Sequence, residues 1–294
     1  INWNATTSSK SSYGVYLYVS SGNYGNNNIT GNNLTIYSQL STGYGIYLSN
    51  SGNSNSNTIQ SNTINVNASS IGYGVYLVNA GSSLMDSNTI QSNTINVNVL
   101  GGSTATGYGV YLFVVSGGTI SSSIIQSNTI NVYSNASTSA FRSYGVLLQN
   151  ADYSNVSLLR INSTAPSAYA SDVYLQVGSS GNVFTDNILL GTNWSSYILA
   201  NGGTNNTFTN VSYSGGEFVG TSAELIRKWY YTAYVNDTTG ANVSGANITA
   251  GVIGSSFKSS WSIFAGLLFL LAYYLFLEKK GKRNVRKRRY SRRH

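Results

Sequence analysis

The sequence contains no cysteine, one proline and one histidine, and that histidine is the last residue, His294. Without cysteine the chain cannot form a disulfide or a thiolate metal site, and a Ser-His-Asp triad cannot be built around a histidine on a cationic terminus. Charged residues make up only 8% of the chain, which is less than half of the usual share in globular domains. This composition argues against an ordinary enzyme.

The net charge of +8 is concentrated at one end of the chain. Ten of the 16 basic residues lie between Lys279 and Arg293, whereas residues 1–260 contain six basic and seven acidic side chains. The long, nearly neutral part lacks the basic stripe that follows a phosphate backbone. We therefore predict that nucleic acid is not a partner.

Two short motifs recur along the chain. The segment SNTIQSNTINVN occurs at residues 56–67 and 87–98, and IQSNTINV recurs at 125–132. Between these copies, YG(V/I)YL begins at Tyr13, Tyr44, Tyr73 and Tyr108, and the variant YGVLL begins at Tyr144. These copies begin 31, 29, 35 and 36 residues apart, and such a period is typical of stacked supersecondary units.

Each repeat contains three short runs in which apolar and polar residues alternate, as in β-strands. In the repeat that begins at Tyr73 the apolar residues of these runs are Val75 and Leu77, then Ile90, then Ile95 and Val97. Short turns can connect parallel strands when each strand pairs with its equivalent one coil later. The pattern therefore predicts an all-β parallel β-helix with three strands per coil.

Aligning the repeats produces columns of identical residues. One inward column runs from Ile29 to Phe208 and another from Leu34 to Leu189. Between them lies a polar column, which we interpret as a structural ladder: Asn32, Asn62, Asn93, Asn128 and Asn187. Asparagine tolerates the left-handed backbone conformation and can bond the amides above and below it, so it suits a sharp bend. Leu159 and Val211 interrupt this column.

This arrangement resembles the right-handed parallel β-helix family, the pectin-lyase-like superfold with PbH1-type repeats, whose members carry an asparagine ladder at such a bend. The resemblance covers roughly residues 10–215, or about seven three-strand coils, and indicates fold more strongly than function. We assign residues 1–220 to this solenoid. Because the sequence begins at Ile1, without an initiator methionine or a signal peptide, we expect the solenoid to be truncated at its N-terminus.

Residues 221–254 are expected to form a short β neck. The pattern Asp237, Gly240, Val243, Gly245 and Ala246 resembles the start of the Ig-like or carboxypeptidase-regulatory-like domains that follow a β-helix in archaeal-type surface proteins. Too few residues remain before the composition changes for a complete sandwich. Residues 255–260 then form a linker.

Residues 261–277, WSIFAGLLFLLAYYLFL, contain no charge and are followed at once by the basic segment 278–294. A helix of this length reaches the lower limit for crossing a bilayer, and the flanking cations favour a cytoplasmic tail by the positive-inside rule. We therefore predict a single-pass type I protein of the cell membrane with its solenoid outside. Thirteen N-x-S/T sequons, including one at Asn67, agree with a glycoprotein exposed at the cell surface.

No grouping of catalytic residues emerges from the repeat. Asp86, Asp152, Asp172, Asp186 and Glu217 occupy different coil positions, so no aligned carboxylate pair is predicted. Copper sites need histidine, methionine or cysteine, and the chain has only Met85 and the terminal histidine. We predict no enzyme activity, no metal and no cofactor.

The outward columns are the candidate binding sites. A column of aromatic residues is expected on one outer face, and it could bind sugars by stacking: Tyr16, Tyr47, Tyr76, Tyr111 and, after Leu147, Tyr174. The alternative is that these tyrosines serve only the sheet, because tyrosine has high strand propensity and stacks well on itself.

The sequence therefore predicts a structural or adhesive surface protein that presents a repetitive polar-aromatic face to glycans or envelope proteins. Two alternatives remain open. One is a membrane-tethered polysaccharide lyase or hydrolase whose catalytic coils precede Ile1, and the other is a passive stalk. The ligand, the oligomeric state and the glycosylated sequons are not defined by the sequence.

Overall fold

The structure is a computed structural model that describes residues 2–5, 11–23, 25–101, 105–115, 117–135, 142–165, 169–191, 198–213 and 216–230. These residues belong to one compact unit, Ile1–Tyr231. Within this described part, no helix is long and apolar enough to cross a membrane. The predicted linker 255–260, membrane helix 261–277 and tail 278–294 lie outside the described residues, as does the neck beyond Tyr230.

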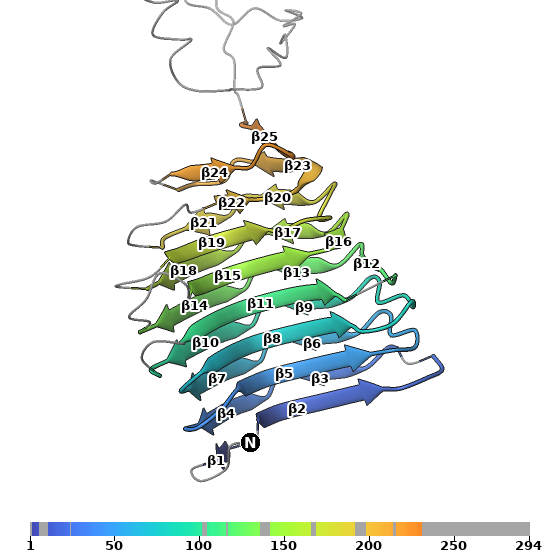
Figure 1. Cartoon of the computed structure of the whole chain (residues 1–294), viewed down its shortest axis with the longest axis vertical. Helices are drawn as coiled ribbons and strands as arrows, with labels where there is room; N and C mark the ends of the chain where they lie inside the picture. Colours follow the sequence, from blue (N-terminus) through green and yellow to red (C-terminus); the bar gives the residue numbers. More distant parts are fainter. Residues whose placement is uncertain are drawn as a thin grey trace, which may run out of the picture. The chain divides into compact units, whose positions relative to one another are not determined.

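The described chain forms an all-β parallel solenoid in which strands stack as successive rungs (Figure 1). Sheet 1 contains β1 (Asn2–Ala5), β4 (Asn33–Ser38), β7 (Thr63–Ala68), β10 (Thr94–Val99), β14 (Thr129–Ser134), β18 (Arg160–Thr164) and β21 (Ile188–Leu189). Sheet 2 contains β2 (Ser12–Val19), β5 (Gly43–Asn50), β8 (Ile71–Asn79), β11 (Thr106–Val114), β15 (Arg142–Gln149), β19 (Tyr169–Leu175), β22 (Ile198–Ala200) and β24 (Glu217–Val219).

Sheet 3 contains β3 (Asn28–Thr30), β6 (Thr58–Gln60), β9 (Thr89–Gln91), β13 (Ile124–Gln126), β17 (Asn155–Ser157), β20 (Val183–Thr185), β23 (Gly203–Thr209) and β25 (Ala223–Lys228). A short pair, β12 (Ile120–Ser121) and β16 (Ala151–Asp152), adds a corner between sheets 2 and 3. The prediction of an all-β parallel solenoid with three strands per turn is confirmed. About five regular turns lie between Ser12 and Thr164, fewer than the seven coils predicted, and shorter, less regular turns follow.

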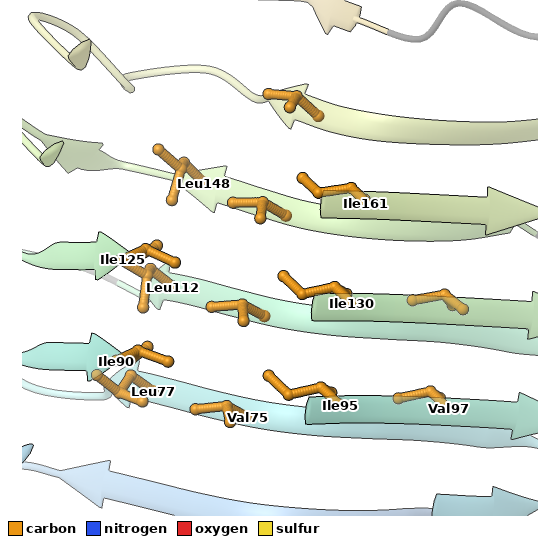
Figure 2. Close-up of a cluster of buried hydrophobic side chains, with 14 of the residues drawn as sticks. Val75, Leu77, Ile90, Ile95, Val97, Leu112, Ile125, Ile130, Leu148 and Ile161 are labelled. Carbon is orange, nitrogen blue, oxygen red and sulfur yellow. The ribbon is translucent and has the colours of Figure 1, made fainter. Parts of the chain in front are cut away.

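The core is a set of apolar columns that run through the stacked turns. Ile59, Ile90 and Ile125 pair in direct register in sheet 3, and all three are buried. In the close-up of Figure 2, Ile90 lies against Leu77 from sheet 2 in the same way that Ile125 lies against Leu112 one turn later. Because every turn buries the same kind of residue at the same position, the repeats can stack without a register shift.

Two bends flank the sheet 3 strand of each regular turn. At the bend that follows this strand, Ser61, Ser92 and Ser127 have φ values of 55°, 55° and 54°. These serines directly precede the ladder asparagines, so the expectation that asparagine itself occupies the left-handed conformation is wrong. The preceding residue turns the chain, and this leaves the asparagine side chain buried between the two sheets.

The last strand, β25, belongs to residues 221–254, which the sequence assigns to the neck. It pairs in parallel with β23, so the described part of that segment continues sheet 3. A register shift occurs between Gly203 and Asn206 in this final pair. The turns after Thr164 are therefore less regular than those before it.

Candidate binding surfaces of the solenoid

The ladder asparagines are connected by hydrogen bonds along the solenoid. The Nδ2 atoms of Asn32, Asn62 and Asn93 each donate to Oδ1 of the next ladder asparagine, at 3.0 Å in every case. Each of these Oδ1 atoms also accepts a bond at 2.9 Å from the backbone N–H of the preceding ladder residue. Beyond Asn128 the series of side-chain hydrogen bonds is interrupted at Leu159, which has no amide side chain. The backbone N–H of Leu159 still donates to Oδ1 of Asn187 at 2.9 Å.

A second ladder, which the sequence reasoning missed, lies at the bend before the sheet 3 strand. Its positions are Asn27, Asn57, Asn88, Ser123, Ser154, Asn182 and Asn206, stacked one per turn. Asn57 Nδ2 donates to Asn88 Oδ1 at 2.9 Å, and Asn182 Nδ2 donates to Asn206 Oδ1 at 3.1 Å. The signal was present, because SNT occurs twice in every full copy of the repeat, five residues apart.

The predicted tyrosine column is present on the outer face of sheet 2, and a second column runs beside it. Tyr16, Tyr47, Tyr76 and Tyr111 pair in register, followed by Leu147 and Tyr174. We call this the outer tyrosine row. The inner tyrosine row consists of Tyr13, Tyr44, Tyr73, Tyr108 and Tyr144. The two rows lie three residues apart along each strand.

A glycine makes this double row possible. Gly74 and Val75 both face the core: a Cβ on Gly74 would lie 2.3 Å from Ile95 Cγ2, and Val75 is fully buried. Two consecutive inward residues interrupt the strict alternation of the strand, as a β-bulge does. Tyr73 and Tyr76, which flank this pair, consequently both point outward and stack with centroids 4.7 Å apart.

Within each row the rings stack face to face. Centroids of Tyr13 and Tyr44 lie 4.8 Å apart at 5°, and those of Tyr44 and Tyr73 lie 4.9 Å apart at 5°. Rings stacked in this way cover one another's faces, so the tyrosine rows offer mainly ring edges and hydroxyl groups to a partner. Exposure falls along the outer row from 49% at Tyr16 to 8% at Tyr111.

Burial in the middle of the tyrosine rows disfavours ionisation of the phenol groups there. Burial raises the pKa of Tyr73, Tyr76 and Tyr111, and the charge that neighbouring tyrosinates would carry raises each pKa further. Desolvation also raises the pKa of Tyr144, although Arg142 opposes this shift by donating from Nη1 to the phenol at 3.2 Å. The face is therefore neutral, apart from this single arginine among the described outward residues of strands β2 to β19.

Of the five candidate carboxylates, Asp186 accepts from the side chain of Asn210 and Glu217 pairs with Arg227. The other three accept from backbone N–H groups of the solenoid. Asp86 Oδ1 accepts from Ser121 N at 2.9 Å, and Asp152 Oδ1 accepts from Ser180 N at 2.6 Å. The carboxylate of Asp172 is buried and accepts from Ser163 N and Gly191 N, each at 2.8 Å. Desolvation outweighs these bonds and raises the pKa of Asp172 to about 6. Among the described residues, no group of three or more His, Asp or Glu side chains could hold a metal ion.

The outward face of sheet 1 is a regular array of hydroxyl and amide groups. Thr63, Thr94 and Thr129 pair in register, and so do Asn65, Asn96 and Asn131 two residues later. Asn96 Nδ2 donates to Asn65 Oδ1, and Asn131 Nδ2 donates to Asn96 Oδ1, both at 2.9 Å. The sequence reasoning placed no site on this face, although the repeated TINVN supplies its side chains.

Comparisons with known proteins do not assign this chain to a family. No family model matches the sequence, and no curated protein matches it. Among solved structures, HetL, a pentapeptide repeat protein involved in heterocyst differentiation regulation from the cyanobacterium Nostoc sp. strain PCC 7120, aligns at 14% identity over 72% of this chain and 87% of its own, with a TM-score of 0.15. QnrB1, a plasmid-mediated fluoroquinolone resistance protein, aligns at 11% identity over 74% of this chain and 92% of its own, with a TM-score of 0.14. At such TM-scores neither likeness carries weight, and the solenoid assignment stands on the strand pairing.

Proposed function

We propose that this chain is a structural and adhesive protein of the cell surface, whose solenoid presents repetitive outer faces to glycans or envelope proteins. The observation that carries this proposal is the register of the outward residues: Tyr44, Tyr73 and Tyr108 repeat at one position of successive turns, with ring centroids 4.9 and 4.8 Å apart. A surface that repeats with every turn can meet a repeating partner at many points at once, so weak single contacts add up.

Within this proposal the solenoid is of the right-handed, pectin-lyase-like type with PbH1 repeats. The support is the buried asparagine ladder from Asn32 to Asn128, which lies at the bend where that resemblance places it. Asp86, Asp152 and Asp172 accept hydrogen bonds from backbone N–H groups, which favours a structural role for them over the lyase or hydrolase alternative.

The proposal also includes a membrane anchor at residues 261–277 and a cytoplasmic tail at 278–294. The apolar run favours insertion, and each Lys or Arg of the tail would cost about 2.5 to 3.5 kcal/mol at the bilayer centre. Protease added to intact cells is expected to digest the solenoid and to leave a tag placed after His294 protected. A tag that is digested from outside would contradict this topology.

The adhesive role is tested on cells that display the full chain. We expect them to attach to surfaces coated with glycans or isolated envelope material more strongly than cells displaying a matched variant. That variant carries serine at six outward positions of the central turns: Tyr47, Tyr76, Tyr111, Asn65, Asn96 and Asn131.

Equal attachment of both cell types, with equal amounts of chain at the surface, would support the passive stalk. Release of reducing or unsaturated sugar ends from a polysaccharide by the purified full chain would support the enzyme alternative. Either result would overturn the adhesive proposal.

A further inference from the structure

The outward face of strands β4, β7, β10 and β14 in sheet 1 differs from the tyrosine face in its chemistry. Twelve side chains form it, three from each strand: Asn33, Thr35 and Tyr37; Thr63, Asn65 and Asn67; Thr94, Asn96 and Asn98; Thr129, Asn131 and Tyr133. None of them is charged. The first charge on this face of the described strands is Arg160, at the start of β18.

The amides of this face are held in fixed positions. In the row of Asn65, Asn96 and Asn131, the central amide donates one N–H to Asn65 and uses one oxygen lone pair to accept from Asn131. An asparagine amide has two N–H donors and an oxygen with two lone pairs. Asn96 therefore keeps one donor and one acceptor for a ligand, side by side and already oriented.

Such a donor and acceptor pair matches the hydroxyl groups on adjacent carbons of a sugar ring. Each hydroxyl can donate and accept, so two neighbouring hydroxyls can bond the N–H and the oxygen of one amide together. Because the amides repeat with each turn, the same pair of bonds is offered again about every 4.8 Å along the solenoid. A polymer of sugars can use several of these positions at once.

Two tyrosines bracket the amides of the neighbouring row. Tyr37, Asn67, Asn98 and Tyr133 occupy one register position in four successive strands, so the two rings lie three strand spacings, or about 14 Å, apart. Unlike the two tyrosine rows of sheet 2, neither ring is stacked on another aromatic ring of the described residues. Tyr37 is 44% exposed. A tyrosine side chain is longer than an asparagine side chain, so a ring at either position can reach past the amides and pack against the apolar C–H face of a sugar.

We propose that this face binds a neutral polysaccharide chain that runs along the solenoid axis, with its sugar rings packed on Tyr37 and Tyr133 and its hydroxyl groups bonded to the amides of the adjacent row that contains Asn96. The proposal rests on the adhesive function above and names both its face and its class of ligand. The absence of charge favours a neutral glycan, because an acidic polymer would find no cation between β4 and β14 with which to pair.

The test measures retention of the full chain on insoluble polysaccharides. The protein is purified in detergent from a host without N-glycosylation, because Asn67, Ala68 and Ser69 form a sequon on this face. The probes are cellulose, chitin and mannan as neutral polymers, and pectate and alginate as acidic ones. We expect binding to at least one neutral polymer that changes little between low and high salt.

The double variant Tyr37→Ala/Tyr133→Ala is expected to weaken this binding about tenfold, because two anchoring rings are lost. The matched control is Tyr18→Ala/Tyr169→Ala, which removes two exposed tyrosines of sheet 2 that belong to neither tyrosine row and is expected to leave binding within about twofold. Circular dichroism and melting temperatures of both variants verify that the fold persists. The single variant Asn96→Asp, which adds a charge without changing the size of the side chain, is expected to weaken binding as well.

Several results would overturn the inference. They are binding only to acidic polymers, binding to no neutral polymer, and loss of binding in the sheet 2 control instead of the sheet 1 variant. Inhibition of ice growth without retention on any glycan would assign the regular array to another kind of ligand. If cells displaying the chain still adhere to envelope material in any of these cases, the adhesive function stands and only this choice of face and ligand falls.

Discussion

Asn93 donates from Nδ2 both to Oδ1 of Asn128 at 3.0 Å and to the backbone oxygen of Ile59 at 2.9 Å. Ile59 belongs to the turn before Asn93, and Asn128 belongs to the turn after it. The Oδ1 atom of Asn93 in turn accepts from both nitrogens of Asn62. One buried side chain therefore joins three consecutive turns.

The first prediction concerns this side chain. Asn93→Leu is expected to lower the free energy of unfolding by about 1 to 3 kcal/mol, because it leaves buried N–H and C=O groups of Asn62 and Ile59 without partners. Asn96→Leu, on the solvent face of the same strand, is expected to cost less, because water can replace the lost bonds. Denaturant titration followed by circular dichroism measures both. Equal losses in the two variants would contradict the register.

Ser123 marks a defect in the second ladder that can be repaired. Its Oγ atom is buried without a hydrogen-bond partner, and it stands where the neighbouring turn carries Asn88. Ser123→Asn is expected to stabilise the solenoid by about 1 kcal/mol, because the new Oδ1 can accept from the nitrogens of Asn88. The melting temperature of the variant checks this expectation. A lower melting temperature would mean that the space between these turns does not admit the longer side chain.

Gly74 is predicted to be intolerant even of alanine. A Cβ there would lie 2.3 Å from Ile95 Cγ2 and 2.6 Å from the backbone oxygen of Gly109. Gly74→Ala is expected to destabilise the fold by about 1 to 3 kcal/mol or more, because the backbone atom cannot move aside. At Gly216 a Cβ would meet nothing within 4 Å, so Gly216→Ala is the matched control. Similar unfolding midpoints for the two variants would show that the strand relaxes around the added methyl group.

The fourth prediction is a gain of stability in mild acid. The carboxyl of Asp172 has a pKa of about 6 in the folded chain, against about 3.9 when unfolded. As the pH falls through 6 the folded state binds a proton that the unfolded state does not, so the free energy of unfolding rises until about pH 4.

Unfolding free energies at pH 7.5 and pH 5 measure this effect. Burial also raises the pKa of Glu217, and it contributes in the same direction. Asp172→Asn removes the carboxyl group with the larger pKa shift. The variant is expected to show a smaller difference in unfolding free energy between the two pH values. An unchanged pH dependence in that variant would show that Asp172 is not its source.

The sequence predicted the solenoid because its columns repeat residue for residue. Ile90 and Asn93 can be aligned with their neighbours by eye, and strand pairing follows from that alignment. The second ladder was harder to find, because Ser123 and Ser154 replace asparagine in two consecutive turns and break the column.

The second tyrosine row was missed for a different physical reason. Strict alternation places residues three apart on opposite faces of a strand, so Tyr73 and Tyr76 could not both be predicted to point outward. Only the packing of Gly74 against Ile95 shows that two consecutive residues of the strand, Gly74 and Val75, both face the core. The left-handed serines were missed because a long-range contact, the asparagine ladder, decides which residue of the bend turns the chain.

The interruptions of the two asparagine ladders and of the two tyrosine rows lie close together along the chain, and this has a mechanical consequence. The first ladder is interrupted at Leu159 and the second at Ser123, while the outer tyrosine row meets Leu147 and the inner row ends at Tyr144. In a linear array of repeats each turn contacts only its nearest neighbours. Under force the array therefore separates first between the turns whose mutual contacts are weakest. A pull on the C-terminal end should peel away the turns beyond β15 first, and the turns from β5 to β11 should remain as a short, intact rod.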